Sequence, residues 1–176
     1  GWLEERVFRF ILGHTILVTD PPRLAEEYRA RYGLRPDRIR IVPHYIEVAR
    51  FQVSGTREQA RQKIGLPLAA KVILFVHRLS RRKGAHLIPE IAAEVIRLRS
   101  GNAGTSADSA KHEKDVIFVV VGDGPERENL EARIRNQGLE RYVRLVGEVA
   151  QRDIVPYFHA ADLFLLPSEE EGFQHV

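Results

Sequence analysis

The sequence predicts an α/β protein whose parallel sheet is covered by helices on both faces. Two continuous apolar runs rich in β-branched residues, 71–77 and 116–121, are typical of strands buried on both sides. From residue 71 onward, strands and amphipathic stretches follow one another in the order β-α-β-α-β-α-β. This alternation implies parallel strands joined by right-handed crossovers.

The other elements after residue 71 follow from apolar spacing and boundary residues. Four apolar residues at helical spacing predict a helix over 85–99: Leu87, Ile91, Val95 and Leu98. Gly138 ends a helix predicted over 125–137. Residues 100–115 hold no large apolar side chain and predict an exposed loop. A strand, a short helix and a last strand are predicted over 142–146, 152–159 and 162–166.

The residues before about position 54 have a pattern of their own. They predict a strand, a helix and a strand over 16–18, 21–32 and 39–42. Asp20 is a possible N-cap of this helix and Gly33 its stop. We expect this segment to belong to a neighbouring domain, with a short helix over 57–64 after it.

Composition excludes several classes of protein. The 176 residues include no cysteine, which excludes a disulfide scaffold, thiolate catalysis and a cysteine zinc site. The sequence contains no run of about 18 apolar residues, so it predicts no membrane-spanning helix. The net charge of +3 does not by itself indicate nucleic acid binding. The histidines lack metal-ligand spacing, and no serine-hydrolase or P-loop motif occurs. Methionine is also absent, so we expect the chain to be a piece of a longer protein.

Chemistry-bearing residues follow the strands. In an open parallel sheet, ligands bind at the carboxyl ends of the strands, so the four loops that begin there should share one edge. These loops are 77–84, 122–125, 147–149 and 167–173. Together they bring basic side chains, glycine turns and a carboxylate cluster to that edge.

Arg78 and Lys83 lie in a loop that leads into a helix. A guanidinium fork, an ammonium group and helix N-terminal amides suit a diphosphate. The alternative is a solvated basic turn formed by Arg81, Arg82 and Lys83.

Gly122 could let backbone approach a ligand closely, or it could simply form a tight strand-to-helix turn. Glu169 and Glu170 fit a solvated acidic loop. Glu171 differs, because the aromatic Phe173 follows closely and is poorly explained as an exposed loop residue.

Four segments resemble, in order, signature segments of the large family of retaining, nucleotide-sugar-dependent glycosyltransferases called glycosyl transferases group 1. Residues 73–84 resemble "G-R-L-x-x-x-K-G", and 119–130 resemble "G-D-G-P-x-x-x-x-L". Residues 143–147 are similar to "V-x-F-x-G", and 160–173 to "A-A-D-x-x-x-x-P-S-x-x-E-G-F-G". The family includes mannosyltransferases, glycogen synthases and sucrose synthases.

The resemblance implies the GT-B architecture, in which two Rossmann-like domains face each other across a cleft. Residues 1–53 would then be the end of the N-terminal domain and the interdomain linker. Residues 54–176 would be the Rossmann-like donor-binding domain, incomplete at its C-terminus. The acceptor-binding domain would lie almost wholly outside this chain.

The resemblance also implies roles for individual residues. Arg78 and Lys83 would bind the donor diphosphate and neutralise charge on the leaving group. Gly122 would let backbone lie against the donor, and Val149 lies in a turn that would face the base. Glu171 matches the first glutamate of an E-x7-E motif that contacts the donor sugar. The implied catalytic residues are Glu171, Arg78 and Lys83; Phe173 and Gln174 would add backbone amides to the donor site.

The resemblance predicts transfer of a sugar, with retention, from a GDP-mannose-like or UDP-sugar-like donor to a sugar or lipid-linked acceptor. No cofactor or bound metal is expected, since the arginine–lysine pair takes the cation's place. We expect no nucleic acid partner. We expect a cytoplasmic location, with peripheral association at a membrane surface as a further option. The fragment alone is expected to be inactive.

Several positions depart from the family pattern. His77 replaces the glycine before Arg78, and Gln174 replaces the second glycine of "G-F-G". The second glutamate of E-x7-E would fall at position 179, beyond the printed sequence. These departures keep open a non-catalytic nucleotide-binding module of the same fold. A GT-B sugar-nucleotide epimerase is a weaker alternative.

Overall fold

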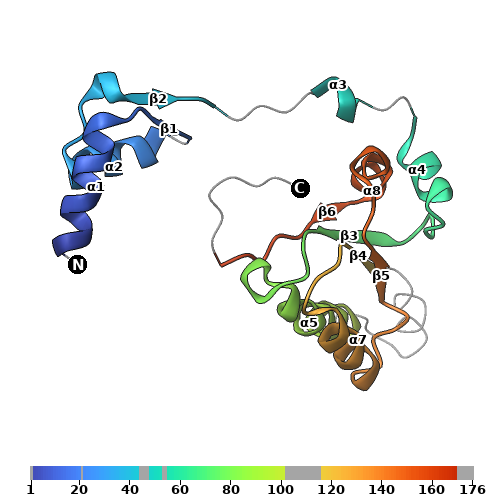
Figure 1. Cartoon of the computed structure of the whole chain (residues 1–176). Coiled ribbons are helices and arrows are strands. Elements are labelled where there is room, and N and C mark those ends of the chain that lie inside the picture. The colour runs from blue at the N-terminus through green and yellow to red at the C-terminus, as the bar shows by residue number, and fades with distance from the viewer. Residues whose placement is uncertain (1, 21, 44–47, 53–54, 102–115, 170–176) are drawn as a thin grey trace. The chain divides into compact units, whose positions relative to one another are not determined.

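The structure is a computed structural model that describes residues 2–20, 22–43, 48–52, 55–101 and 116–169. The chain divides into two compact units, one up to residue 49 and one from residue 50 to 171 (Figure 1). The short helix α3 (Val48–Phe51) spans the point of division. The assignment of the two parts to a preceding domain and a donor-binding domain, with its boundary at 53/54, stays a prediction.

The first unit is built on a parallel pair of short strands, β1 (Leu17–Thr19) and β2 (Ile39–Ile41). Helix α2 (Pro22–Tyr32) joins them, followed by a 3-10 turn at Pro36–Arg38. The strand, helix and strand predicted for this segment are therefore confirmed. Helix α1 (Trp2–His14), which precedes them, was not predicted.

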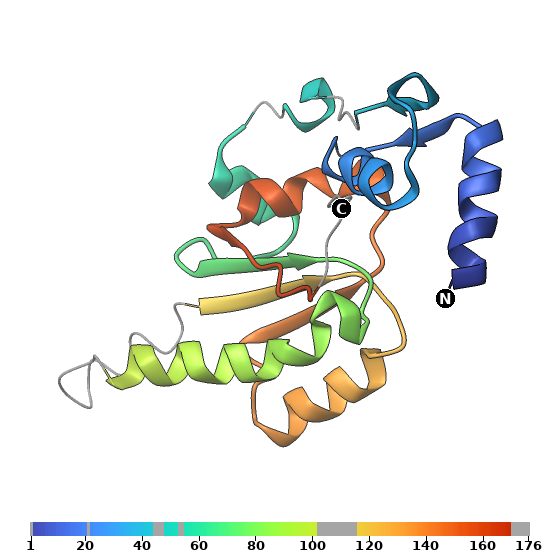
Figure 2. The same cartoon turned by 90° about the vertical axis from the view of Figure 1, so that its left-hand side faces the viewer.

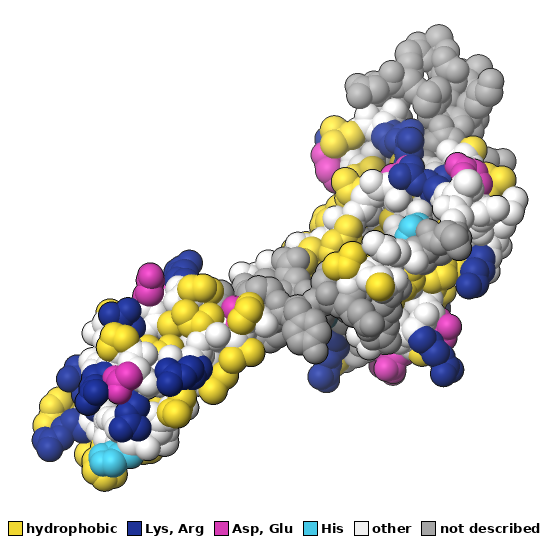
Figure 3. Space-filling view, turned by 90° about the horizontal axis from the view of Figure 1, so that it is seen from above, with side chains coloured by type: hydrophobic (Ala, Val, Ile, Leu, Met, Phe, Trp, Pro, Cys, Tyr) yellow, Lys and Arg dark blue, Asp and Glu magenta, His cyan; other side chains and the backbone are white. Residues whose placement is uncertain are grey.

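Helix α1 is amphipathic, with Glu5, Arg6 and Arg9 on one side and most of its apolar side chains on the other, so the helical period was a signal present in the sequence. Phe8 stacks on Tyr32 of α2 with ring centroids 5.8 Å apart. By contrast, Trp2 and Phe10 are each 71% exposed. Hydrophobic and arginine side chains consequently lie next to each other on the surface of this unit (Figure 3).

The second unit contains a four-stranded sheet in the order β5-β4-β3-β6, and all its strand pairs are parallel. Strands β3 (Lys71–Val76) and β4 (Val116–Val121) pair along their full length. Strand β5 (Val143–Gly147) pairs with β4, and β6 (Leu163–Phe164) pairs with β3. The predicted parallel α/β sheet is confirmed, although the last strand is shorter than the predicted 162–166.

Helices cover both faces of this sheet (Figure 2). Helices α5 (Ile88–Gly101) and α7 (Arg127–Asn136) pack on one face. Helices α4 (Arg57–Lys63) and α8 (Val155–Ala160) pack on the other. Short 3-10 turns occur at Arg81–Lys83, Ala85–Leu87 and Gln151–Asp153. No helix among the described residues is long and apolar enough to cross a bilayer.

Apart from Lys71, the two central strands are apolar because successive side chains enter opposite cores. Phe75 and Phe118 are each 1% exposed and belong to the core cluster under α5 and α7. Val72 and Leu74 are fully buried in the cluster under α4 and α8. Burying one such side chain contributes about 1.5–3 kcal/mol, so these strands supply a large part of the stability of the unit.

Asp162 ties α4 to the start of β3 and β6. Its Oδ2 accepts from Arg61 Nη2 at 2.6 Å and from the Val72 backbone N–H at 2.7 Å. Its Oδ1 accepts from Arg57 Nη1 at 2.8 Å. Arg61 is only 5% exposed and also donates to the Ala160 carbonyl at 3.0 Å. A charge buried to this degree requires its counter-ion.

The pKa of Asp162 is lowered in the folded state. Desolvation acts to raise the pKa of Asp162, but the Val72 N–H and the nearby arginines favour the carboxylate and outweigh that effect. A lowered folded pKa stabilises the fold at pH values above the unfolded pKa, which is about 4. This stabilisation is lost as the pH falls below that value.

We predict that Asp162→Asn lowers the free energy of unfolding by about 3 kcal/mol at pH 7, because Arg61 then stays buried without a counter-ion. Urea unfolding measures this loss. Glu94→Gln is the matched control, since Glu94 forms an exposed ion pair with Arg97 and should cost less than about 1 kcal/mol. The difference between wild type and Asp162→Asn should shrink below about pH 4. Equal losses of unfolding free energy in both variants would show that Asp162 contributes no more to stability than an exposed ion pair does.

Candidate functional site

The loop after β3 carries the basic residues of the site. Arg78, Arg81 and Arg82 are exposed, whereas Lys83 is partly buried. The Arg81–Lys83 turn ends at Gly84, whose φ of +73° places it in the left-handed region. Helix α5 follows after one further 3-10 turn, so its N-terminal end lies close to these cations along the chain. Both cations and helix N-terminal amides attract anions.

His77 caps the first amide of this loop. The Arg78 backbone N–H donates to His77 Nδ1 at 2.8 Å. His77 stands where the family pattern has glycine, and its side chain thus occupies the Arg78 amide at the start of the loop.

The loop after β4 lies directly against the loop after β3. Gly122 has a φ of +130°, and a Cβ atom there would stand 2.0 Å from the His77 carbonyl oxygen. At Gly124 a Cβ would stand 2.5 Å from the Leu79 carbonyl oxygen. Both glycines are therefore required by contact between two backbones within the protein. Contact of Gly122 with a donor stays a prediction.

Backbone hydrogen bonds hold these loops together. Leu79 is central: its N–H donates to the Asp123 carbonyl at 2.9 Å, and its carbonyl accepts from the Glu126 N–H at 3.0 Å. Its side chain is 1% exposed and joins the core under α5 and α7. Sequence reasoning did not single out Leu79. The sequence did carry a signal for a buried side chain here, because Leu79 is an apolar residue between Arg78 and three further basic residues.

The loops after β5 and β6 complete the edge. Gly147 accepts from the Gly122 N–H at 2.7 Å, and Val149 packs partly buried against the core under α4 and α8. In the β6 loop, the Glu169 N–H donates to the Arg82 carbonyl at 3.2 Å. At Gly84 a Cβ would stand 2.1 Å from the carbonyl oxygen of Pro167. The four loops expected at one edge thus meet there.

Part of the predicted site lies outside the described residues. The residues concerned are Glu171, Phe173 and Gln174; Glu170, predicted to lie in a solvated acidic loop, is also outside them. The structure brings together the loops that carry Arg78, Lys83, Gly122 and Val149. Among the described residues no group of three histidine, aspartate or glutamate side chains could hold a metal ion.

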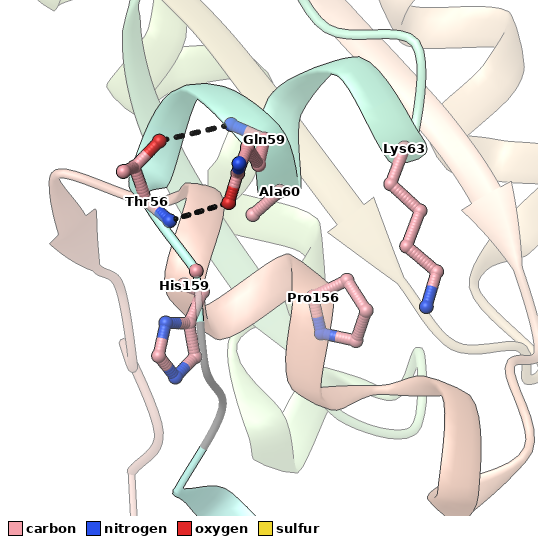
Figure 4. Close-up of a pocket in the computed structure, with 7 residues that line it drawn as sticks. Thr56, Gln59, Ala60, Lys63, Pro156 and His159 are labelled. Atoms are coloured by element: carbon pink, nitrogen blue, oxygen red, sulfur yellow. Dashed lines mark hydrogen bonds between the residues drawn. The ribbon is translucent and has the colours of Figure 1, made fainter.

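A separate pocket of about 160 Å³ lies between α4 and α8 (Figure 4). Its lining includes Thr56, Gln59, Lys63, Pro156 and His159. Thr56 and Gln59 form a capping box at the start of α4, with reciprocal hydrogen bonds of 3.3 and 3.0 Å. Their polar groups thus serve the helix end. None of the residues predicted to bind the donor lines this pocket.

The parallel sheet and its interlocked edge loops define a Rossmann-like α/β domain, and structural comparison finds the same fold in solved proteins. Anabaena HepE in complex with UDP aligns with a TM-score of 0.70 at 20% identity, over 96% of this chain and 43% of HepE. Sucrose-phosphate synthase from Thermosynechococcus elongatus aligns with a TM-score of 0.68 at 22% identity, over 99% of this chain and 40% of the synthase. Likeness at this level of identity concerns the fold.

The model of the family described as "Glycosyl transferases group 1" matches residues 56–176, and the chain belongs to that family. A D-inositol 3-phosphate glycosyltransferase from Acidothermus cellulolyticus is 32% identical over 163 residues, which are 89% of this chain and 34% of that enzyme. A second one, from Catenulispora acidiphila, is 30% identical over 161 residues, 89% of this chain and 35% of that enzyme. The chain spans about a third of the length of these relatives. The resemblance noted in the sequence is thereby confirmed.

We predict that Gly122→Ala is far more costly than Gly138→Ala. Both glycines have positive φ, but a Cβ at Gly138 meets no atom within 4 Å. Gly138→Ala should therefore cost only the backbone strain, about 1 kcal/mol. Gly122→Ala adds collision with the His77 carbonyl and should cost about 3 kcal/mol or more. Urea unfolding compares the two, and similar losses would contradict the backbone contact as the reason for glycine.

Proposed function

We propose that the protein containing this chain is a glycosyltransferase that transfers a sugar, with retention, from a nucleoside-diphosphate sugar, and that residues 54–176 bind the donor. The single observation that supports this most is the convergence of the loop of Arg78 and Lys83 with two glycine turns at one sheet edge. The position agrees with the general rule for ligand sites of parallel sheets. The HepE structure, which holds UDP, supports a nucleoside diphosphate as the ligand.

In the proposed reaction the nucleoside diphosphate leaves the sugar and gains negative charge. Arg78 and Lys83 neutralise this charge, a form of stabilisation that acts on the transition state. Glu171 contacts the sugar, and backbone amides at Phe173 and Gln174 hold the sugar or the phosphates. The donor carries uridine or guanosine, and the acceptor is a sugar or a lipid-linked sugar bound by another domain.

The proposal assigns the role of a metal ion to the cationic pair. A guanidinium and an ammonium can supply the positive charge that a divalent cation supplies elsewhere. Nucleotide affinity should then be the same with and without EDTA.

A second candidate function is a nucleotide-binding module without catalysis. The observation that favours it is the hydrogen bond between the Arg78 N–H and His77 Nδ1, which occupies an amide at the expected phosphate site. Sugar transfer by the full-length gene product, abolished by Glu171→Ala, would exclude this candidate.

We predict that Arg78→Ala and Lys83→Ala each weaken the binding of UDP or GDP about tenfold or more, since each removes a charge-assisted hydrogen bond to phosphate. Isothermal titration calorimetry of the full-length gene product measures the affinities. Arg97→Ala is the matched control, because Arg97 lies on α5 and pairs with Glu94; its affinity should be unchanged. Wild-type affinity in both site variants would refute the assignment.

A further inference from the structure

Arg127 is the first residue of α7 and is held by carboxylates on two sides. Its Nη1 donates to Asp123 Oδ2 at 3.0 Å, and its Nε donates to Glu131 Oε1 at 2.9 Å. The Arg127 side chain is 33% exposed. Partly exposed ion pairs of this kind contribute little to stability. Two such bonds on a planar group do, however, fix its orientation.

The guanidinium of Arg127 lies against Gly147 at the end of β5. A Cβ atom at Gly147 would stand 3.3 Å from Arg127 Nη1, and Gly147 has a φ of +87°. The Gly147 carbonyl also accepts from the Gly122 N–H at 2.7 Å. The turn that begins at Gly147 is therefore held between the β4 loop and a side chain from α7.

Asp123 extends this arrangement to the loop after β3. Its Oδ1 accepts from the Gly124 N–H at 2.6 Å, and its backbone carbonyl accepts from the Leu79 N–H at 2.9 Å. Leu79 follows Arg78 directly. One guanidinium thus connects, through Asp123 and Gly147, the turns after three adjacent strands.

We propose that Arg127 is a positioning residue of the donor site, which holds the turn of Gly147 to Val149 in the shape that receives the nucleoside. This inference rests on the proposed function. The role of Arg127 can nevertheless be tested separately from the proposed function, because Arg127 supports only the nucleoside end of the site. The diphosphate end has its own backbone supports, from Glu169 to Arg82 and from Gly84 to Pro167.

The separation gives a specific expectation for Arg127→Gln. Loss of the guanidinium leaves the Asp123 bonds from the Gly124 and Leu79 N–H groups in place but removes the contact with Gly147, so the nucleoside turn loses its support. Displacement of a ligand-binding group by about 1 Å can reduce function by up to about 100-fold. We expect affinity for the nucleoside diphosphate to fall about tenfold, while affinity for inorganic pyrophosphate stays within about twofold. Arg127→Lys, which keeps a donor for Asp123, should recover part of the loss.

The experiment titrates UDP, GDP and inorganic pyrophosphate into the full-length gene product by calorimetry, with a thermal melt of each variant. Arg97→Gln is the control, because it removes another carboxylate-paired guanidinium from a helix of the same unit. The melting temperature of Arg127→Gln should match that of Arg97→Gln. Selective loss of nucleoside diphosphate binding in Arg127→Gln supports the inference.

Three outcomes overturn it. If neither nucleotide binds the wild-type protein, the proposed function and this inference both fail. If the wild type binds a nucleotide and Arg78→Ala weakens binding, but Arg127→Gln binds like wild type, the function stands and the inference fails. If Arg127→Gln loses nucleotide and pyrophosphate affinity equally, together with a lower melting temperature, Arg127 has only a structural role.

Discussion

Backbone-to-backbone contact at three glycines is the constraint on which the site depends. Gly84, Gly122 and Gly124 each lie so close to a neighbouring carbonyl that a Cβ atom would stand 2.0 to 2.5 Å from it. Ordinary van der Waals contact for such atoms begins near 3.4 Å. Side chains at these positions would separate the loops. With glycine, the loops share hydrogen bonds and form one rigid edge on the sheet.

This rigidity bears on the proposed chemistry because charges that are already positioned stabilise a developing charge without reorganisation. Arg78 and Lys83 lie on a loop fixed at Leu79 and at Gly84. The side chains of Arg78 and Lys83 can still change rotamer, whereas the backbone positions that carry them are fixed. The edge is in turn fixed to a sheet whose opposite end is tied to α4 by Asp162. Asp162 therefore stabilises the fold at one end of the sheet, whereas the strand-end loops carry the proposed donor site at the other.

The fold from residue 71 onward could be predicted because the two central strands are almost wholly apolar and glycine marks the turns. Helix α1 could also have been predicted, because its apolar and charged residues follow the helical period; that signal was overlooked. The meeting of the strand-end loops at one edge could also be predicted, because it follows from the parallel order of the strands. The role of Gly122 could not, because contact with the His77 carbonyl depends on packing between segments some 45 residues apart. Arg127 was missed for the same reason: its partner Gly147 is distant in the sequence.

The central claim is that the strand-end loops form a nucleotide site. The most direct measurement is an amide NMR map of the full-length gene product during titration with UDP or GDP. The account predicts that the perturbed amides cluster at 77–84, 122–126 and 147–149. Saturable binding that instead perturbs the pocket between α4 and α8, or an absence of perturbation at saturating nucleotide, would contradict it.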